Sequence, residues 1–386
     1  MFLKDINMKR IYQSLYVLVA IAMAGLYVSC TKDDHKGLPR IKYVRVTNPV
    51  SADSLLTGAF QGNLIAIIGE NLEDATEIWF NDQKASLTPT YITSTSILVS
   101  VPAPIPKVIT NKIKIIFAGG NTLLYDFKVQ ISEPVVAAMD CEYALTGAEA
   151  TLRGDYFYEP LSVTFEGGVK AELVSVADKI IKMKIPAGAL PGQVTVTTNF
   201  GITKSNFWFR DNRNIFISSD PFTGWWNSSF VVTNPAAGDP PAINGNYIRV
   251  KKVIGAWAWT EVAGGPASAM GAISKNIPDE AILKPSDYNL KFEVNTMKPY
   301  NNNVLKINVG LLAENNDNYK WLPPYDTKGQ WQTVIIPFED IATSYGKPLS
   351  VSPDGYWTRL LFHGGGDLDC DMSFDNFRVV PKVLKK

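Results

Sequence analysis

Residues 64–72, Leu-Ile-Ala-Ile-Ile-Gly-Glu-Asn-Leu, share their pattern with residues 150–157, Ala-Thr-Leu-Arg-Gly-Asp-Tyr-Phe. Further pairs of similar segments follow both of them in the same order, which indicates one unit of roughly 80 to 90 residues that occurs twice. Within each copy, short apolar runs alternate with turns rich in Gly, Pro, Asn and Asp, a pattern typical of an all-β sandwich. The sequence therefore predicts two tandem β-sandwich domains, at residues 41–131 and 132–210.

In both copies a glycine follows the first of these strands and a proline ends the third. We expect Gly69 and Gly154 in sharp turns, where glycine is favoured if the turn needs a positive φ. The prolines, Pro102 and Pro186, stop strand pairing. This order of strands and turns resembles that of IPT/TIG immunoglobulin-like domains. The resemblance implies that the two domains are spacers, with direct binding of a partner as the alternative.

The repeat ends near residue 211, and the chain beyond residue 200 carries eight of its nine tryptophans. Alternating apolar runs, for example at residues 290–294 and 374–380, still indicate strands. A larger β-sandwich of jelly-roll type is therefore predicted for residues 211–384. The expected fold class is all-β, with two tandem immunoglobulin-like (IPT/TIG) sandwiches followed by this jelly-roll-like sandwich.

Composition excludes some classes of function. At 386 residues the chain is too long for one hydrophobic core. Lys plus Arg and Asp plus Glu balance at 37 each, so no basic field favours nucleic acid. Cys141 and Cys370 fall in different predicted domains, which argues against a disulfide between them, and neither belongs to a metal-binding CxxC pair. Cys370 is expected to be a small buried hydrophobe, and no cofactor is expected.

The N-terminus has the pattern of a bacterial export signal. A basic pair precedes an apolar run at residues 15–28, which has the length of a signal-peptide core and is short for a bilayer span. Ser29-Cys30 after it resembles the lipobox of bacterial lipoproteins, which implies a signal peptide at residues 1–29 and a lipid on Cys30. Residues 30–40 are expected to be a tether, and Lys32-Asp33-Asp34 resembles the export signal of Bacteroidetes surface lipoproteins. The expected location is the outer membrane, facing outward; a single-pass anchor and a plain secretory signal are the alternatives.

Aromatic residues gather beside turn formers between residues 319 and 357. Rings next to Asn, Asp, Gly and Pro are expected on exposed loops, where they contact ligands rather than a core. The apolar face of a pyranose ring can stack on such rings. The candidate residues for glycan binding are Trp321, Tyr356, Trp357, Tyr325 and Tyr319. Asn315, Asn316, Asp317, Asn318, Lys320 and Asp326 are candidate partners for sugar hydroxyls.

Other tryptophans are assigned differently. Trp257 and Trp259 are two residues apart, so we expect them on one strand face in a core. Trp331 begins an apolar strand and is also expected in a core, and Trp79 lies within a spacer strand. Trp225-Trp226 follows a loop, and adjacency directs the two rings to opposite sides, so one of them can be exposed.

The C-terminal region resembles the glycan-binding domain of surface glycan-binding protein B, a family of Bacteroidetes polysaccharide-utilisation lipoproteins. The resemblance rests on five segments in order, at residues 246–247, 256–259, 291–296, 331–337 and 374–381. It implies a non-catalytic protein that binds xyloglucan or β-glucan at the cell surface and works with an outer-membrane glycan importer. It also implies that Trp321, Tyr356 and Trp357 form the platform, with Tyr325 and Tyr319 as further members.

Two other classes of function stay open. A glycosidase or lyase needs two carboxylates around the scissile bond, and the acids of this region form no recognisable pair, so no catalytic residue is assigned. His363 is isolated in sequence, and a calcium site at residues 367–371 lacks the usual loop glycine, so no metal is expected. A cell-surface adhesin would share the spacers and the anchor without needing exposed rings.

Overall fold

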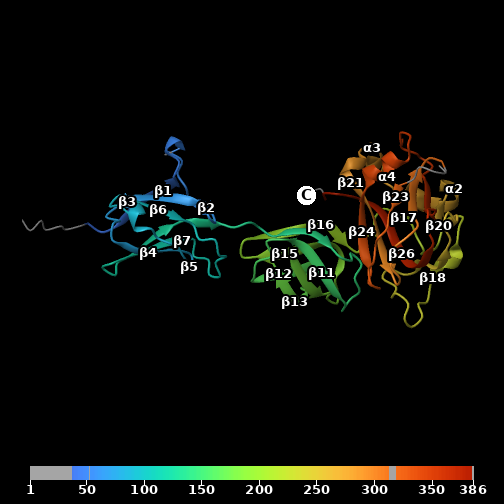
Figure 1. The fold of residues 1–386 in the computed structure, drawn as a ribbon, viewed down its shortest axis with the longest axis horizontal. Helices are drawn as coiled ribbons and strands as arrows, with labels where there is room; N and C mark the ends of the chain where they lie inside the picture. Colours follow the sequence, from blue (N-terminus) through green and yellow to red (C-terminus); the bar gives the residue numbers. More distant parts are fainter. Residues whose placement is uncertain (1–36, 52, 313–318, 385–386) are drawn as a thin grey trace, which may run out of the picture. The chain divides into compact units, whose positions relative to one another are not determined.

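The computed structural model describes residues 37–51, 53–312 and 319–384. The predicted signal peptide, the lipidation site Cys30, most of the tether and the candidate residues at positions 315–318 lie outside this part of the chain. No helix among the described residues is long and apolar enough to cross a membrane. The described chain divides into two compact units, Met1–Gln130 and Ile131–Lys386, and each is built mainly from strands, which confirms the all-β prediction (Figure 1).

The first unit is an immunoglobulin-like sandwich of sheets with the orders β1-β3-β6 and β5-β4-β7-β8, plus the parallel pair β2-β9. Alternate residues of the strands are buried, as in Lys112–Phe117, so one face of each sheet forms the core. The strands are β1 (Arg40–Val46), β2 (Gly58–Phe60), β3 (Leu64–Glu70), β4 (Ala75–Phe80), β5 (Gln83–Lys84), β6 (Ser96–Ser100), β7 (Lys112–Phe117), β8 (Thr122–Asp126) and β9 (Lys128–Gln130).

The second unit begins with a sandwich of the same kind, with sheet orders β10-β11-β14-β13 and β12-β15-β16. Its strands are β10 (Val135–Met139), β11 (Glu149–Asp155), β12 (Leu161–Glu166), β13 (Glu172–Ala177), β14 (Ile180–Lys184), β15 (Leu190–Thr198) and β16 (Gly201–Phe209). The repeated sequence pattern therefore produces two sandwiches with corresponding sheets.

Gly69 and Gly154 occupy corresponding positions in the two sandwiches. A methyl group on Gly69 would lie 2.1 Å from a backbone carbonyl oxygen of the neighbouring strand, and one on Gly154 would lie 1.7 Å from the corresponding oxygen. Positive φ angles occur two residues later, at Asn71 (55°) and Tyr156 (61°). Close backbone approach, and not the expected positive φ, is therefore the reason for glycine here.

The C-terminal sandwich packs a six-stranded sheet on a four-stranded one. The larger sheet has the order β18-β19-β26-β21-β24, with β17 also paired to β26, and the smaller has the order β20-β25-β22-β23. The strands are β17 (Ile215–Ile217), β18 (Val231–Val232), β19 (Tyr247–Ile254), β20 (Thr260–Gly265), β21 (Tyr288–Thr296), β22 (Leu305–Gly310), β23 (Tyr319–Trp321), β24 (Gln332–Pro337), β25 (Trp357–Phe362) and β26 (Leu368–Pro381).

Short helices border this sandwich. They are α2 (Ala267–Met270), α3 (Asp279–Leu283), α4 (Phe338–Ser344) and the 3₁₀ turns η3 (Ser228–Phe230), η4 (Gly271–Lys275) and η5 (Pro285–Asp287). The core between the sheets is rich in aromatic rings, with Phe292 stacked on Phe377 at 4.7 Å. Cys370 belongs to this core at 1% exposure, which confirms the expected buried hydrophobe.

An apolar contact joins the second immunoglobulin-like sandwich to the C-terminal one. Tyr247 and Trp331 of the C-terminal region belong to the core of the immunoglobulin-like sandwich, and their rings meet edge to face at 5.6 Å. Each polar group is satisfied there: the Tyr247 hydroxyl donates to Pro240 O at 2.8 Å, and the Trp331 indole N–H donates to Pro241 O at 2.9 Å. Trp331 is 8% exposed, so the core position expected for it is confirmed.

Buried charges join the same two sandwiches. Glu142, from the immunoglobulin-like side, accepts hydrogen bonds from Lys291 Nζ at 2.6 Å and from Arg378 Nη2 at 2.7 Å. Arg378 Nη1 also donates to Glu293 at 2.9 Å. Arg378 and Glu293 are 0% exposed and Glu142 is 1% exposed. Residues 132–210 and 211–384, which are predicted to be separate domains, therefore share both a core and an ion network.

Strand alternation predicts that Asp369, Asp371 and Asp375 of β26 lie on its outward, solvated face. Asp369 is exposed and paired with Lys298 at 2.6 Å, whereas Asp371 and Asp375 are each only 5% exposed. The expectation is wrong for these two because β26 is a central strand, and the second immunoglobulin-like sandwich covers part of its other face. The Asp371 carboxylate is satisfied there by Arg249, at 2.7 and 3.0 Å.

Candidate functional site

Tryptophans gather on the outward face of the four-stranded sheet. Along β25, Leu360 and Phe362 belong to the core, so alternation directs Trp357 and Arg359 to the other face. The loops after β17, before β20 and after β25 bring further rings beside them. We call this group the aromatic surface, and it consists of Trp225, Trp226, Trp257, Trp259, Trp357 and His363.

One half of the aromatic surface is a cluster of three indoles. Trp225 and Trp357 meet at a right angle with centroids 5.3 Å apart, and Trp226 lies 5.9 Å from Trp225 and 6.1 Å from Trp357. The Trp225 backbone N–H donates to Gly264 O at 2.9 Å, which fixes the loop to β20. A side chain at Gly264 would meet a backbone oxygen of β25 at 2.2 Å, so this approach needs glycine. Trp225 is 60% exposed, as expected for one of the Trp225-Trp226 pair.

The other half consists of Trp257, Trp259 and His363. The imidazole lies 5.6 Å from the Trp257 ring and 5.0 Å from the Trp259 ring. Trp257 is 67% exposed and Trp259 is 47% exposed, so the core position expected for both is wrong. The reason is local: Trp257 has a φ of +60° and its N–H donates to Gly364 O at 2.7 Å, so this segment is a turn before β20 and not a strand.

Arg359 lies between the two halves. Its guanidinium carbon is 5.1 Å from the Trp226 centroid, 5.6 Å from that of Trp259 and 5.9 Å from that of Trp357, within the range of cation–π attraction. Its Nε lies 3.5 Å from the Glu261 carboxylate. The same carboxylate accepts a 2.8 Å hydrogen bond from the Trp259 indole N–H. Burial raises the pKa of Glu261, while this hydrogen bond and the charge of Arg359 oppose the shift.

Several polar atoms at the aromatic surface lack a hydrogen-bond partner among the described residues. They are both amide atoms of Asn308, Nε1 of Trp357 and Nδ1 of His363. Asn308 lies directly opposite Arg359 in the pairing of β22 with β25, so its amide belongs to the same outward face. Such groups normally bind water or a ligand, because a buried polar group without a partner is costly.

The sequence-predicted residues Tyr356 and Trp321 are not on this surface. Tyr356 is 1% exposed within the core, and its hydroxyl accepts a 3.2 Å hydrogen bond from Ser352 N. Trp321 is 9% exposed and packs 5.6 Å from Phe292 and 5.3 Å from Tyr300. The expectation of open rings is therefore wrong for both, because β23 and the start of β25 turn these positions toward the inner face of the sheet.

Tyr325 and Tyr319 are partly buried against the same core. Tyr325 lies 5.0 Å from Trp321, and its hydroxyl donates to Gln332 at 3.1 Å. Trp357 is thus the predicted residue whose ring joins the aromatic surface. Trp257 and Trp259 are site residues that the sequence did not predict. Glycines flank their segment, so the rule that rings beside turn formers lie on exposed loops would have indicated their exposure.

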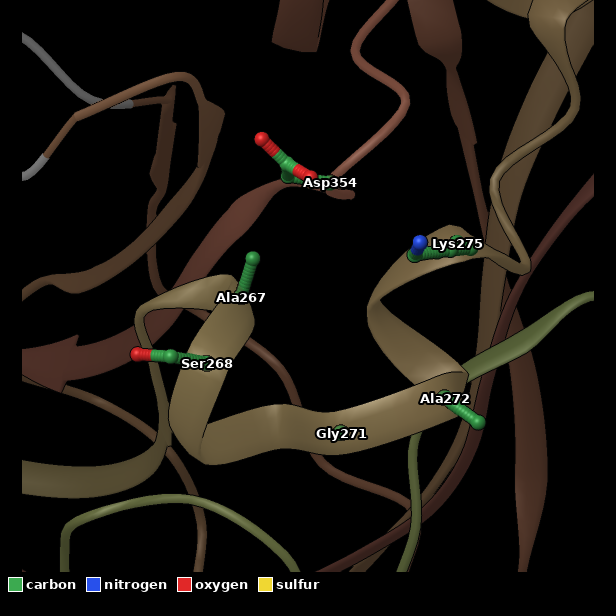
Figure 2. Close-up of a pocket in the computed structure, with 6 residues that line it drawn as sticks. All are labelled: Ala267, Ser268, Gly271, Ala272, Lys275 and Asp354. Atoms are coloured by element: carbon green, nitrogen blue, oxygen red, sulfur yellow. The ribbon is translucent and has the colours of Figure 1, made fainter.

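A shallow cavity of about 660 Å³ lies next to the turn that precedes Trp357. Figure 2 shows that Lys275 and Asp354 come from two different segments, η4 and the loop before β25. Small residues form the remaining wall, namely Ala267, Ser268, Gly271 and Ala272. A cavity lined in this way can accept a polar group through Lys275 and Asp354.

The acids at residues 367–371 do not converge on a common point. Each has a separate partner: the Ala256 N–H for Asp367, Lys298 for Asp369 and Arg249 for Asp371. In the described part of the chain, no group of three or more His, Cys, Asp or Glu side chains is arranged to hold a metal ion. The calcium alternative in this segment therefore has no structural support.

The model of the surface glycan-binding protein B xyloglucan binding domain matches residues 209–381. This match covers the C-terminal sandwich, 173 of the 386 residues of the chain. The crystal structure of surface glycan-binding protein PbSGBP-B from Prevotella bryantii is 25% identical and has a TM-score of 0.68. That likeness covers 90% of this chain and 99% of the other.

Two further proteins resemble this chain. An IPT/TIG domain-containing protein of Bacteroides ovatus is 32% identical over 169 residues, which are 40% of this chain and 34% of that protein. The match thus spans about a third of the length of this curated relative. The SGBP-B from a complex xyloglucan utilization locus in Bacteroides uniformis is 19% identical, with 89% of this chain and 100% of the other covered and a TM-score of 0.47.

Proposed function

We propose that the protein binds a polysaccharide of the β-glucan or xyloglucan class, without cleaving it, through the aromatic surface. One observation carries this proposal: exposed indoles and polar atoms without partners occur together on one face of the four-stranded sheet. Trp225, Trp257 and Trp259 supply exposed rings, and the buried Asn308 amide on the same face, 2% exposed, has no hydrogen-bond partner among the described residues. The family match to a xyloglucan binding domain supports the same ligand class.

The chemistry of the surface suits sugar rings. The C–H face of a pyranose is apolar and lies against indole, while its hydroxyls need hydrogen bonds at the edge. Removing about 200 Å² of apolar surface from water would yield roughly 5 kcal/mol before ordering costs at 25 cal/mol/Å². Because those costs offset part of it, we expect an affinity in the micromolar to millimolar range, that is about −8 to −4 kcal/mol.

Arg359 gives the surface a rigid polar centre. Three indoles and Glu261 hold the guanidinium, so it loses little side-chain entropy when a ligand binds. Arg359 is 6% exposed and Asn308 is 2% exposed, so both are buried at this face and act by holding the rings in position. Stacking on the exposed rings then supplies most of the affinity for the polysaccharide, and this centre keeps the rings in position.

The protein would carry out this function at the cell surface. Surface glycan-binding is the stated property of the matched family. We extend this to an outer-membrane location through a lipid on Cys30, and to association with a glycan importer. These two extensions rest on the lipobox-like sequence and on the resemblance described above.

A glycosidase is the second candidate, because Glu261 is a partly buried carboxylate with a raised pKa beside aromatic rings. Such a group can act as a general acid. Hydrolysis also needs a second carboxylate across the bond, and the charged partner of Glu261 on this face is Arg359. Binding without cleavage therefore fits the arrangement better.

Affinity gel electrophoresis on xyloglucan and mixed-linkage β-glucan tests the proposal. Trp225→Ala and Trp257→Ala should each weaken retention about tenfold or more, because a well-placed aromatic residue contributes roughly 2 kcal/mol. Trp79→Ala, in the first sandwich, is the matched control and should migrate as wild type. Unchanged retention in both surface variants would reject the site, and new reducing ends after prolonged incubation would favour the glycosidase. Binding to no glycan on an array would favour the adhesin.

The same gels test the other predicted residues. A binding role for Tyr319 and Tyr325, whose rings are partly exposed, stays a prediction, and Tyr325→Ala examines it directly. Trp321→Ala and Tyr356→Ala should lower the stability of the sandwich, because both rings belong to its core. Loss of retention in these two variants counts toward the platform only if their thermal unfolding is unchanged.

A further inference from the structure

A second polar cavity, of about 220 Å³, lies at the start of the C-terminal sandwich and shares no lining residue with the aromatic surface. It is bounded by the segment around β17, the loop before β19, η4 and its following residues, and the middle of β26. We call it the asparagine pocket, and its polar walls include Ser218, Asp220, Asn244, Asn276, Asp375 and Asn376.

The pocket contains a buried carboxylate oxygen without a partner. Asp375 is 5% exposed; its Oδ1 accepts a 2.8 Å hydrogen bond from Asn376 N, and its Oδ2 has no partner among the described residues. Burial raises the pKa of Asp375 well above its usual range, and the charges of Glu293 and Asp220 act in the same direction. An ionised carboxylate in this position needs a counter-charge.

The charge of Arg378 in the buried ion network lowers the pKa of Asp375, but no hydrogen bond joins these two side chains among the described residues. Arg378 directs its hydrogen bonds to Glu142, Glu293 and the Asn376 carbonyl oxygen, and Lys291 pairs with Glu142. Two cations and two glutamates in this network thus neutralise one another. Asp375 is the additional negative group beside them, so a cation in the pocket would balance the charge.

The other oxygens around the pocket are held in place. Asp220 accepts a 2.8 Å hydrogen bond from Asn246 N, which fixes its carboxylate at the mouth of the pocket. Asn376 Oδ1 accepts from Asn244 Nδ2 at 2.5 Å, and the Asn276 amide nitrogen donates to Ile215 O at 2.6 Å. These contacts leave the oxygen of Asn276 and a second lone pair on the oxygen of Asn376 for another partner.

We propose that the asparagine pocket binds Ca²⁺ through the carboxylates of Asp375 and Asp220, together with oxygens from Ser218, Asn276 and Asn376. A donor set made only of oxygens suits a hard cation, whereas zinc sites in proteins are built mainly on His nitrogen and Cys sulfur. Ca²⁺ accepts six to eight oxygens in flexible geometry, and water would complete the shell. A bound water could also accept from Asn376 Nδ2, which has no partner among the described residues.

Such an ion would tie together three segments that are distant in sequence. Asp220 follows β17, Asn276 follows η4, and Asp375 lies on β26. They meet near the junction with the second immunoglobulin-like sandwich, where Asn212 of the pocket accepts a 3.0 Å hydrogen bond from the Tyr143 hydroxyl. The ion would therefore stabilise the part of the C-terminal sandwich that carries this junction.

Thermal unfolding and calorimetry of the mature full-length protein test the site. Extracellular calcium sites have dissociation constants of about 0.1 to 1 mM, so 10 mM CaCl₂ should lower the unfolding equilibrium constant by roughly 10- to 100-fold relative to EDTA. Asp375→Asn and Asp220→Asn should each remove most of this calcium-dependent shift. Asp369→Asn, an exposed acid on the same strand, is the matched control and should keep it.

The readout is the difference in thermal unfolding between the CaCl₂ and EDTA samples of the same variant. A change in basal stability affects both samples and therefore does not obscure this difference. A wild-type protein with no calcium-dependent shift and no binding heat would overturn the proposal, and ordered water would then occupy the pocket. A shift that persists undiminished in Asp375→Asn would also overturn it. An equal shift with MgCl₂ would overturn the choice of Ca²⁺.

Discussion

Arg378→Met should destabilise the second unit strongly. Arg378 is fully buried and hydrogen-bonded to Glu142 and Glu293, which are themselves 1% and 0% exposed. Methionine fills a similar length without charge, so the substitution leaves two carboxylates in the interior with only Lys291 beside one of them. Breaking a buried pair by removing one partner costs about 3–5 kcal/mol, because an uncompensated charge remains.

Urea denaturation followed by tryptophan fluorescence and far-ultraviolet circular dichroism measures this effect. With an m-value of roughly 2.5 kcal/mol/M, the expected loss moves the unfolding midpoint by about 1 to 2 M. Arg153→Met is the matched control: its pair with Asp140 is on the surface, with side chains 52% and 34% exposed, so we expect a loss below about 1 kcal/mol. A midpoint for Arg378→Met close to that of the control would refute the reasoning.

Three further predictions concern single residues. Burial raises the pKa of Glu261 in the folded protein, so the folded state binds this proton more tightly than the unfolded state does. The free energy of unfolding should therefore fall as pH rises above about 4.5, and denaturation curves at several pH values should show a smaller fall for Glu261→Gln. Burial raises the pKa of the Cys370 thiol to about 12 and that of the Cys141 thiol as well, so both should react with a thiol reagent only after unfolding. A methyl group at Gly310 would lie 2.2 Å from the Tyr345 ring, so Gly310→Ala should cost about 1–3 kcal/mol in thermal unfolding, whereas no loss would show that the ring moves aside.

The sequence was most informative where the chain alternates regularly. The two repeats predicted two sandwiches because apolar periodicity and turn residues act locally, within one strand and its neighbour. Trp331 was also expected in a core, but it is buried in the core of the second immunoglobulin-like sandwich, whereas Val334 and Ile336 of the strand that follows it face the core of the C-terminal sandwich. Its contact with the second immunoglobulin-like sandwich was not predictable, because that core is formed by segments far apart in sequence.

The candidate site was less predictable, because the direction of a ring depends on which face of its strand is covered. Trp321 and Tyr356 lie beside prolines and glycines, as loop residues do, yet the opposite sheet covers their side of the structure. Trp257 and Trp259 have the spacing of a strand face, yet a left-handed residue turns the chain there. A single sequence does not reveal which face of a strand the opposite sheet covers. The predicted and observed positions of these rings differ for that reason.

The position of Glu142 has a consequence for how such proteins can change over generations. The residue belongs to a spacer-type repeat, but its side chain neutralises a guanidinium and an ammonium of the neighbouring C-terminal sandwich. Recombination that introduced a repeat without an acid at this position would leave Lys291 without this partner and Arg378 with Glu293 as its only carboxylate partner in this network. The spacer next to the C-terminal sandwich therefore cannot be exchanged freely for another repeat, and we expect the two domains to be inherited together.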